Sequence, residues 1–411
     1  MYDVVIVGGG AAGIGAARRL AGTGLNALLI EAGAELGGRA RTIHVDGLAL
    51  DLGCGWLHSA DRNDWTAVAA ERGIAVDRRT PAWGRQHHDL GFPVEEQEDA
   101  RAALNAWITQ IADAAPADDN ASSALPVDPR WHAYIRAMTG FISGVAPDRI
   151  SAADFTAYDQ ASTGQNWRVK SGYGALVATS LPVNALYRCA TTLERLELEA
   201  AGVRLDTNTG SIWARAAIVT VSTAVLAGEA IHWPTAMQPW CDAAYALPLG
   251  RNEKLFLQIA PGAGFENETQ LLGNPRDPAT GAYYIRPFDW PVIECFFGGD
   301  GAELVAREGE AAGFAHALDE LAALMGGDVR RFLRPIAASN WTVTPRIGGA
   351  YSCALPGAAA ERLQLARPLD DRIFFAGEAT SATDFSTAHG AYASGVRAAC
   401  EAARALGRHR R

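Results

Sequence analysis

The stretch Val4-Val5-Ile6-Val7-Gly8-Gly9-Gly10-Ala11-Ala12-Gly13 decides the fold of this chain. Its first four residues are a continuous β-branched run, which is typical of a parallel strand buried on both faces. Gly8, Gly10 and Gly13 then fit the pattern GxGxxG, and residues 14–20 have the composition of a helix. In this pattern the first glycine permits a tight turn, the second lets the backbone approach a pyrophosphate, and the third lets helix and strand pack closely. The stretch therefore predicts a strand, a turn and a helix whose N-terminus faces a dinucleotide phosphate.

An acidic residue follows at the distance that a dinucleotide site requires. Residues 26–30 form a second predicted strand, and Glu31 stands at its end, 18 residues after Gly13. A carboxylate at this place accepts hydrogen bonds from both ribose hydroxyls and repels a 2′-phosphate, which disfavours NADP. The order of strand, helix, strand and acid makes dinucleotide binding a specific prediction, but it does not distinguish NAD from FAD.

Composition and charge exclude several classes of function. The 411 residues are 49% hydrophobic, which is enough for two or three domains with cores of their own. No uncharged apolar run reaches the roughly 18 residues of a membrane-spanning helix, so we expect no membrane span. The net charge is −10 and the one basic block is residues 408–411, which argues against nucleic acid and favours a cationic small molecule. Of the 36 Lys and Arg residues only Lys170 and Lys254 are lysines, so each of these two could have a specific role.

The cysteines indicate a reducing compartment. Six cysteines lie far apart in the sequence, and no two of them form a CxxC pair. This spacing predicts reduced thiols in the cytoplasm, with neither a disulfide framework nor a metal centre.

The pattern along the chain predicts an α/β fold with two domains. The chain begins with a strand, a helix and a strand, continues with mixed strands, and ends with a strand and a helix. We expect a Rossmann-like nucleotide-binding domain with a parallel sheet, discontinuous in sequence, and a second, mixed α+β domain for the substrate. The first domain is assigned residues 1–75, 165–235 and 341–411, and the second is assigned residues 76–164 and 236–340.

Two further elements indicate which dinucleotide to expect. The sequence Gly37-Gly38-Arg39-Ala40-Arg41-Thr42 follows the acid closely, and residues 51–58, with the sequence DLGCGWLH, come next. With these elements the chain resembles the flavin-dependent amine oxidase family, which includes monoamine oxidases, polyamine oxidases and flavin histone demethylases. In that family the first element holds the FAD pyrophosphate, and Arg39 and Arg41 occupy its arginine positions. A guanidinium suits a diphosphate because it forms bidentate, charge-assisted hydrogen bonds.

The resemblance continues in family order to about residue 405. The segments that carry it are residues 169–176 (VKSGYGAL), 218–222 (IVTVS), 247–254 (LPLGRNEK), 340–341 (NW), 348–352 (GGAYS), 374–380 (FFAGEAT) and 386–392 (STAHGAY). Two positions depart from the family pattern, since Ser171 replaces a glycine and Ser222 replaces a proline. Agreement in order along the whole chain is more specific than any one motif.

The resemblance implies three catalytic residues. Lys254 matches a lysine that holds a water at flavin N5 and assists reoxidation by oxygen, a role that suits a compact amine whose pKa shifts on burial. Tyr351 matches one wall of an aromatic cage that orients the substrate amine. Thr387 takes the place of the other wall, as in polyamine oxidases and histone demethylases. Ala350 stands where monoamine oxidases carry the cysteine that bonds to the flavin, so the resemblance implies non-covalent FAD.

The resemblance also implies the residues that contact FAD. They come from the glycine-rich turn, the acid after the second strand, the two elements that follow it, the tryptophan of the NW segment and the closing Gly-Glu element. The predicted set is Gly8, Gly10, Ala12, Gly13, Glu31, Ala32, Gly38, Arg39, Gly53, Gly55, Trp56, Trp341, Gly377, Glu378, Thr387 and Ala388.

The implied activity is that of an FAD-dependent amine oxidase. The motifs are most similar to those of polyamine-oxidase-like members, and the resemblance implies a bacterial-like protein. Hydride would pass from the α-carbon of an amine to flavin N5, which gives an imine and then an aldehyde or ketone. Reoxidation by molecular oxygen would release hydrogen peroxide. The predicted partners are oxygen and a small amine, either a polyamine or an alkyl or arylalkyl amine, and no oligomeric state is predicted.

Two other interpretations remain open at this point. An L-amino-acid oxidase or a desaturase-like oxidoreductase would share the N-terminal and Gly-Glu elements, and a flavin-loaded scaffold would lack catalysis. Lys254 and Tyr351 favour an amine over a desaturase substrate. An L-amino-acid oxidase would need an arginine to bind the substrate carboxylate, and among so many arginines the sequence does not show which one that would be. Four acids, Asp89, Glu95, Glu96 and Glu98, are expected to be solvated. Four aromatic residues, Trp83, Phe92, Trp107 and Trp131, are expected in the core.

Overall fold

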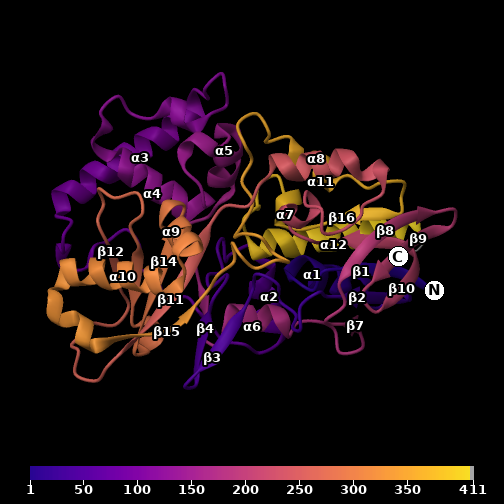
Figure 1. Ribbon diagram of the computed structural model, residues 1–411, viewed down its shortest axis with the longest axis horizontal. Coiled ribbons are helices and arrows are strands. Elements are labelled where there is room, and N and C mark those ends of the chain that lie inside the picture. Colours follow the sequence, from indigo (N-terminus) through magenta and orange to yellow (C-terminus); the bar gives the residue numbers. More distant parts are fainter. Residues whose placement is uncertain (408–411) are drawn as a thin grey trace.

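Two β-sheets, each with its own helices, form the two ends of the molecule (Figure 1). The computed structural model describes residues 1–407, and the basic block 408–411 lies outside the described residues. The N-terminus lies at the end that contains the first sheet, on the right of Figure 1. Within residues 1–407, no helix combines the length and the apolar character needed to cross a membrane.

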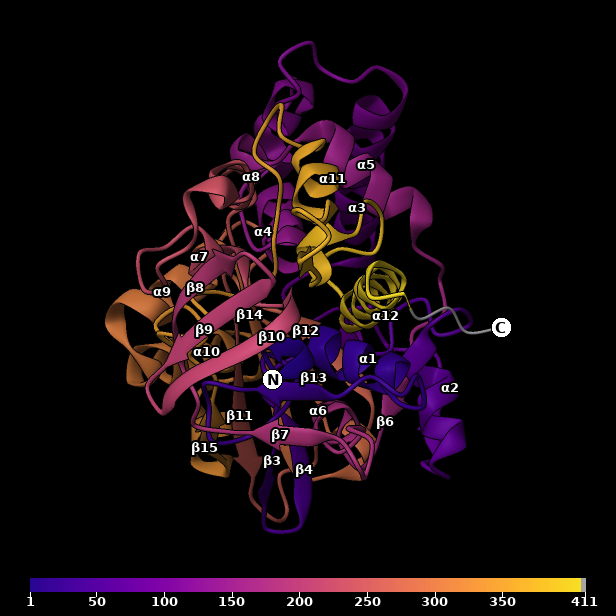
Figure 2. The same ribbon diagram turned by 90° about the vertical axis from the view of Figure 1, so that its right-hand side faces the viewer.

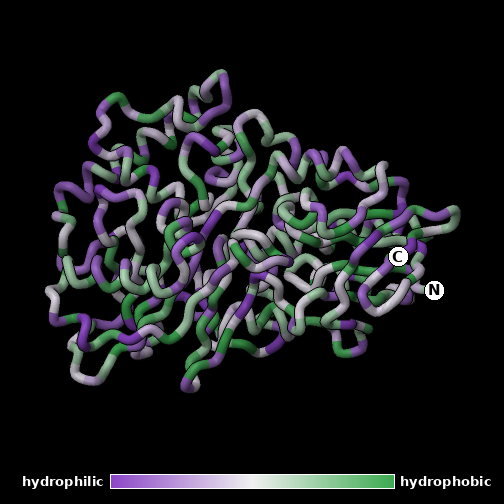
Figure 3. Tube along the Cα trace, viewed as in Figure 1, coloured by the Kyte–Doolittle hydropathy of each residue, from purple (hydrophilic) through white to green (hydrophobic). Residues whose placement is uncertain are grey.

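The first sheet has seven strands in the order β7-β2-β1-β10-β9-β8, with β16 paired to β10. Its strands are β1 (Tyr2–Val7), β2 (Ala27–Ile30), β7 (Leu186–Arg188), β8 (Leu193–Glu199), β9 (Gly202–Thr207), β10 (Gly210–Val219) and β16 (Ile373–Phe375). β1 is parallel to both neighbours, with Val4 beside Ala27 and Ala216, and β16 is parallel to β10. Val4 and Val5 are fully buried, as a strand covered on both faces requires, and hydrophobic stretches of the trace lie around β16 (Figure 3). The predicted Rossmann-like sheet is confirmed.

The helices form three groups. Those around the first sheet are α1 (Ala11–Leu20), α2 (Asp64–Glu71), α6 (Tyr173–Ala178), α7 (Thr223–Leu226), α8 (Gln238–Ala246), α11 (Glu361–Ala366) and α12 (Ala388–Ala405). A helical group in the middle of the chain consists of α3 (Val94–Asp113), α4 (His132–Ser143) and α5 (Ala152–Ala161). The helices on the second sheet are α9 (Asp300–Glu308) and α10 (Glu310–Met325).

The first and last helices, α1 and α12, lie side by side in both views (Figures 1 and 2). A Cβ on Gly15 would come 2.5 Å from the carbonyl oxygen of Tyr392, and one on Gly395 would come 1.9 Å from that of Ala12. Both distances are too short for any side chain, so the two glycines permit a backbone-to-backbone approach. The two ends of the chain thereby form one layer against the first sheet.

The second sheet is antiparallel, with its five strands in the order β12-β13-β14-β11-β15. Its strands are β11 (Asn252–Ile259), β12 (Thr269–Leu272), β13 (Ala282–Ile285), β14 (Val292–Gly298) and β15 (Leu333–Ala338). Leu255 and Leu257 pack with Val305 of α9 and Leu321 of α10 in one buried cluster. Because side chains alternate along a strand, Lys254 points to the opposite face, toward the middle of the molecule.

Two short ribbons connect the ends of the molecule. They pair β3 (Thr42–Val45) with β4 (Leu48–Asp51), and β5 (Val76–Asp77) with β6 (Arg168–Val169). Trp107 and Trp131 are buried in clusters of the helical group, as predicted.

Helix α8 packs with the first sheet although the predicted boundaries put it with the second. Trp240 and Ala244 of this helix share a hydrophobic cluster with Val5 of β1 and Val219 of β10. We keep the division into two domains as a proposal, with this boundary moved from residue 236 to about residue 248.

Candidate active site

One cavity of about 1340 Å³ reaches from the carboxyl end of β1 to the inner face of the second sheet. It exceeds the roughly 300–1,000 Å³ of an ordinary small-molecule pocket, as a site for a dinucleotide and a second molecule should. Every predicted site residue except Gly13 lines this cavity. Segments that lie far apart in the sequence therefore meet in one site.

The glycine-rich turn has the geometry that its sequence predicts. Gly8 has a φ of +109°, and a Cβ on Gly13 would lie 1.9 Å from the carbonyl oxygen of Gly8. Gly10 is the N-cap of α1, with no side chain capping the helix and no acidic residue in its first turn. The amide groups at this helix end are positioned for an anion, because Gly10 and Ala12 line the cavity. Gly13 does not line the cavity; its lack of a side chain allows helix α1 to pack against the turn at Gly8.

Glu31 lies directly beside this turn. Its Oε2 accepts a hydrogen bond from the amide of Gly9, and its Oε1 accepts one from the amide of Gly33, both at 2.6 Å. Each carboxylate oxygen keeps a second lone pair, so Glu31 can still accept from a ribose hydroxyl. Ala32 lines the cavity next to it.

Arg39 and Glu378, from opposite ends of the sequence, form an ion pair on the cavity wall. The distance from Arg39 Nη1 to Glu378 Oε1 is 3.0 Å. Glu378 also accepts from the amide and hydroxyl of Ser352, at 3.2 and 2.7 Å, and from the amide of Ser386 at 2.9 Å. Burial works against its charge, but the nearby guanidinium groups of Arg39 and Arg362 and these hydrogen bonds lower the pKa of Glu378. Arg39 therefore joins the GGR element to the Gly-Glu element.

Two glycines and a tryptophan shape the wall between the two sheets. A Cβ on Gly53 would lie 1.7 Å from the carbonyl oxygen of Arg39, and one on Gly55 would lie 2.9 Å from Nζ of Lys254. Trp341 is buried, and its Nε1 donates to the carbonyl of Leu52 at 3.0 Å. The missing side chains let Gly53 pack against the backbone of Arg39 and let the Lys254 amine approach Gly55.

Lys254 forms an ion pair on the cavity wall. Its Nζ lies 2.7 Å from Oε1 of Glu294, on the neighbouring strand β14. Burial alone would lower the pKa of Lys254, but Glu294 and Asp51 outweigh it and raise that pKa. The shift is opposite to that of an amine buried without a partner. Glu294, which the sequence analysis did not identify, keeps Lys254 as an ammonium ion on the cavity wall.

A second unpredicted acid, Glu253, holds the loop that carries Trp341. Glu253 is fully buried on β11. Its carboxylate accepts from the Ser339 hydroxyl at 2.6 Å, from the Trp341 amide at 3.0 Å and from the Thr342 amide at 3.2 Å. The sequence could not predict this role of Glu253, because a glutamate next to a lysine is common in strands and only the fold shows which loop the carboxylate contacts.

Tyr351 and Thr387 both line the cavity, but their side chains are held differently. The Tyr351 hydroxyl donates to the carbonyl of Phe141, and burial raises the pKa of Tyr351 well above its usual value. Thr387 is the N-cap of α12: its hydroxyl accepts from the amide of Gly390 at 3.0 Å and donates to the carbonyl of Asp384 at 2.6 Å. Thr387 thus has a structural role at this helix end, and its catalytic role stays a prediction.

One cysteine, Cys54, is among the residues that line the cavity, but it does not stand at the position where a cysteine would bond covalently to a flavin. Ala350 occupies that position, and its carbonyl accepts a hydrogen bond from Arg39. Cys54 is the thiol on the wall; burial and the neighbouring Asp51 raise its pKa to about 12. A thiol that stays protonated is a poor nucleophile.

Two histidines on the wall are held by hydrogen bonds. His58 Nδ1 lies 2.7 Å from Oδ1 of Asn166, and burial lowers the pKa of His58, so it is neutral at neutral pH. His389 Nε2 lies 3.3 Å from Oδ1 of Asp384. Both imidazoles are held in fixed orientations toward the cavity.

The part of the cavity next to the second sheet is mostly aromatic and apolar. Its lining includes Trp83, Phe92, Tyr134, Met138, Phe141, Phe155, Leu272, Tyr284 and Phe296. The prediction that Trp83 belongs to the core is wrong, because this side chain is partly exposed and faces the cavity. Phe92 is buried in a core cluster with Trp131, as predicted, and also borders the cavity. Sequence could not reveal this, since a pocket wall and a core use the same residue types. None of the four acids expected to be solvated lines the cavity.

The residues present fit a flavin dinucleotide. An uncapped helix end, a carboxylate with free lone pairs and a close backbone approach at Gly10 match the phosphate and ribose of such a cofactor. The second sheet closes the other end of the same cavity with Lys254 and aromatic side chains. The fold and the site together define a nucleotide-dependent oxidoreductase with a small-molecule pocket beside its cofactor site.

Comparison with known proteins identifies the family. The family described as flavin containing amine oxidoreductase matches residues 87–403, and an NAD(P)-binding Rossmann-like domain matches residues 6–71. The chain therefore belongs to the flavin-dependent amine oxidoreductases and is an enzyme that acts on amines. Polyamine oxidase 5 of Oryza sativa subsp. japonica is 25% identical, over 98% of this chain and 88% of that protein.

Two solved structures share the fold. Cyclohexylamine oxidase from Brevibacterium oxydans aligns with a TM-score of 0.79 and 19% identity, covering 99% of this chain and 100% of that one. A double mutant of putrescine oxidase, redesigned in its cofactor binding, aligns with a TM-score of 0.77 and 17% identity over 99% of both chains. One fold thus serves a cyclic monoamine and a diamine, and substrate class has to be argued from the pocket.

Proposed function

We propose that this enzyme is an FAD-dependent oxidase of monoamines with an apolar body, such as alkyl or arylalkyl amines. The observation that carries the proposal is an aromatic pocket whose inner carboxylate, Glu294, is already neutralised by Lys254 at 2.7 Å. When bound, FAD supplies the two-electron oxidation of an amine to an imine, with molecular oxygen as the final acceptor and hydrogen peroxide as a product.

The charges around the pocket argue against a polyamine. A second ammonium group needs a carboxylate with no partner of its own. On the wall near the second sheet, the carboxylates are Glu294, which Lys254 occupies, and Asp159, which is exposed to solvent. Arg85 and Arg101 line the same region and would repel a polycation.

The chain's own residues position the amine and keep it uncharged. The Tyr351 ring is held by its hydroxyl bond to Phe141, and it can contact an amine through apolar and weak electrostatic attraction. Apolar walls exclude water and disfavour the ammonium form of the substrate. The Lys254 ammonium, fixed by Glu294, would donate to a water or an anionic group at the centre of the site.

We further propose that FAD is bound without a covalent link. Ala350 offers no nucleophile, and the raised pKa of Cys54 keeps that thiol protonated. The residues that would hold FAD line the dinucleotide side of the cavity and include Gly8, Glu31, Arg39 and Glu378.

We also propose a cytoplasmic location. All six cysteines are free thiols, as is usual in a reducing compartment.

Oxidation of an L-amino acid is a second candidate, and one observation favours it. Arg101 lines the pocket near Tyr134, and a guanidinium there could pair with a substrate carboxylate. One of its Nη atoms already donates to the carbonyl of Gly84, which leaves fewer donors for a bidentate pair.

An anaerobic titration of the flavin-loaded enzyme distinguishes these substrates. Benzylamine, hexylamine, putrescine, spermine and several L-amino acids would be added while the oxidised flavin band is recorded. We expect bleaching by the monoamines, reversed by air with formation of peroxide. Bleaching by spermine alone, or by amino acids alone, would contradict the monoamine proposal. Acid precipitation of the same sample should release the yellow colour into the supernatant, and retained colour would contradict non-covalent binding.

A further inference from the structure

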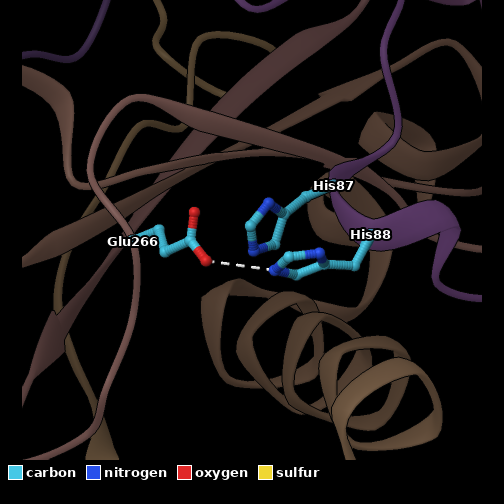
Figure 4. A group of neighbouring side chains, drawn as sticks. All are labelled: His87, His88 and Glu266. Carbon is cyan, nitrogen blue, oxygen red and sulfur yellow. Dashed lines mark hydrogen bonds and ion pairs between the residues drawn. The ribbon is translucent and has the colours of Figure 1, made fainter.

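Three side chains outside the cavity converge on one point. His87 and His88 belong to η1 (His87–Asp89), and Glu266 lies in the loop between β11 and β12. One ring nitrogen from each histidine and one carboxylate oxygen lie within 4.8 Å of one another. Figure 4 shows both imidazoles and the carboxylate directed to the same space.

The backbone of this turn explains how two consecutive histidines reach the same point. Neighbouring residues in an extended chain point to opposite sides. His88 has φ of 48° and ψ of 25°, and Asp89 has φ of 52°, so both are left-handed. This conformation brings the two ring centroids to 4.0 Å. It is uncommon outside glycine, and here it puts two imidazoles on one side of the chain.

The state of the three groups suits a cation. His88 Nε2 lies 3.0 Å from Oε1 of Glu266, and both side chains are more than half exposed and open to solutes. Among the described residues, the His87 ring has no hydrogen-bond partner.

We propose that His87, His88 and Glu266 form a binding site for a divalent transition metal ion of the zinc class. Two imidazoles and one carboxylate are ligands that Zn²⁺ accepts in tetrahedral sites, with a water in the fourth position. Mg²⁺ and Ca²⁺ prefer all-oxygen ligands and should not compete.

The metal site would attach the segment around His87 to the second sheet. The same segment forms part of the pocket wall. Gln86 lines the cavity and precedes His87. Its side chain accepts from the amide of Leu272 at 2.8 Å and donates to the carbonyls of Leu272 and Leu90 at 2.9 and 2.6 Å. A metal ion on the histidines would add a second attachment of this segment, through Glu266, to the same sheet.

Calorimetric titration with ZnCl₂ tests the site directly. The flavin-loaded enzyme must carry no polyhistidine tag. We expect binding of one equivalent of Zn²⁺, weakened at least tenfold in His88→Asn and in Glu266→Gln. Asparagine is chosen because it tolerates the left-handed backbone of position 88, and His44→Ala, which removes an exposed histidine from β3, is the matched control. Absence of binding, or equal binding in all variants, would overturn the proposal.

Limited digestion with trypsin tests the attachment. Arg85 is exposed two residues before His87. We expect Zn²⁺ to slow cleavage at Arg85 at least threefold in the unmodified enzyme and in His44→Ala, but not in His88→Asn. Equal protection in His88→Asn would mean that the ion acts on trypsin or elsewhere on the enzyme, and the proposed attachment would be wrong.

Discussion

The two halves of the cavity are built by different means. The dinucleotide half is largely backbone: Gly10 leaves the chain open to the space that a cofactor would fill, while Gly8 and Gly53 let neighbouring segments pack closely against the cavity wall. The half near the second sheet is a wall of side chains from separate segments, among them Trp83 and Phe296. A tight backbone geometry tolerates few residue types, so it can be recognised in the sequence. An apolar wall tolerates many residue types, so it cannot be recognised in the same way. Substitutions in each half test this contrast.

The largest effect is expected from a methyl group in the dinucleotide half. In Gly13→Ala the added Cβ would lie 1.9 Å from the carbonyl oxygen of Gly8. We expect a loss of about 3 kcal/mol in stability or no folded enzyme at all. In Gly10→Ala the nearest atom to the new Cβ is 3.7 Å away, so thermal stability should be unchanged while the flavin content falls. If both variants were equally stable, steric exclusion at Gly13 would not be the reason for its glycine.

The next effect concerns the residue that stands between the halves. Lys254→Met removes the ammonium and leaves Glu294 without its partner. We expect reoxidation of the reduced flavin by oxygen to slow about hundredfold, or about 2.7 kcal/mol in barrier, with a smaller change in KM. Stopped-flow mixing with aerated buffer measures this rate. Lys170→Met removes the other lysine, which is exposed, and should match the unmodified enzyme; unchanged reoxidation in Lys254→Met would refute the assignment.

A moderate effect is expected from the aromatic wall. Trp83 lines the cavity and its ring centroid lies 4.3 Å from that of Trp56. Trp83→Ala should raise KM for an arylalkyl amine about tenfold, since an aromatic contact of this kind contributes about 1.5 kcal/mol, and should leave the flavin content unchanged. Trp213→Ala alters a tryptophan that is 48% exposed and away from the cavity, and its KM should stay the same. A fall in flavin content in Trp83→Ala would show that the two halves are not separable.

The smallest effect is a pH dependence of stability in the dinucleotide half. The pKa of Glu378 lies below its usual value of 4.5 in the folded enzyme. A carboxyl group of this kind stabilises the fold above its unfolded pKa, and that contribution is lost as the pH falls through the folded pKa. As the pH falls from about 5 to about 3, through the unfolded pKa and toward the lower folded pKa, the unmodified enzyme should lose more of its thermal stability than Glu378→Gln does. A steeper loss in the variant would mean that the folded pKa of Glu378 is not lowered.

Much of the dinucleotide half could be predicted from sequence, because its demands are local and steric. The turn from Gly8 to Gly13 and the acid at Glu31 are close in the chain, and each serves a purpose that few other residues could serve. The ion pair of Arg39 with Glu378 could be expected only by resemblance, since no local pattern joins the two ends of the chain.

The substrate half could not be predicted in the same way. Glu294 follows an ordinary strand pattern, and only the pairing of β11 with β14 brings it to Lys254. Trp83 and Trp107 are the same residue type, yet one lines the cavity and the other is buried in a helical cluster. The difference is set by packing between distant segments, which is a property of the whole fold.

The contact of α1 with α12 has a consequence for how the enzyme is made. Strand β1 is translated long before β16, which completes its sheet, and before α12, which packs on α1. Domains usually fold as units during synthesis, yet here the flavin-binding unit stays incomplete until β16 and α12 have emerged from the ribosome. Nascent chains arrested before β16 should therefore expose the apolar strands β1 and β10, and would depend on chaperones until these two elements are made.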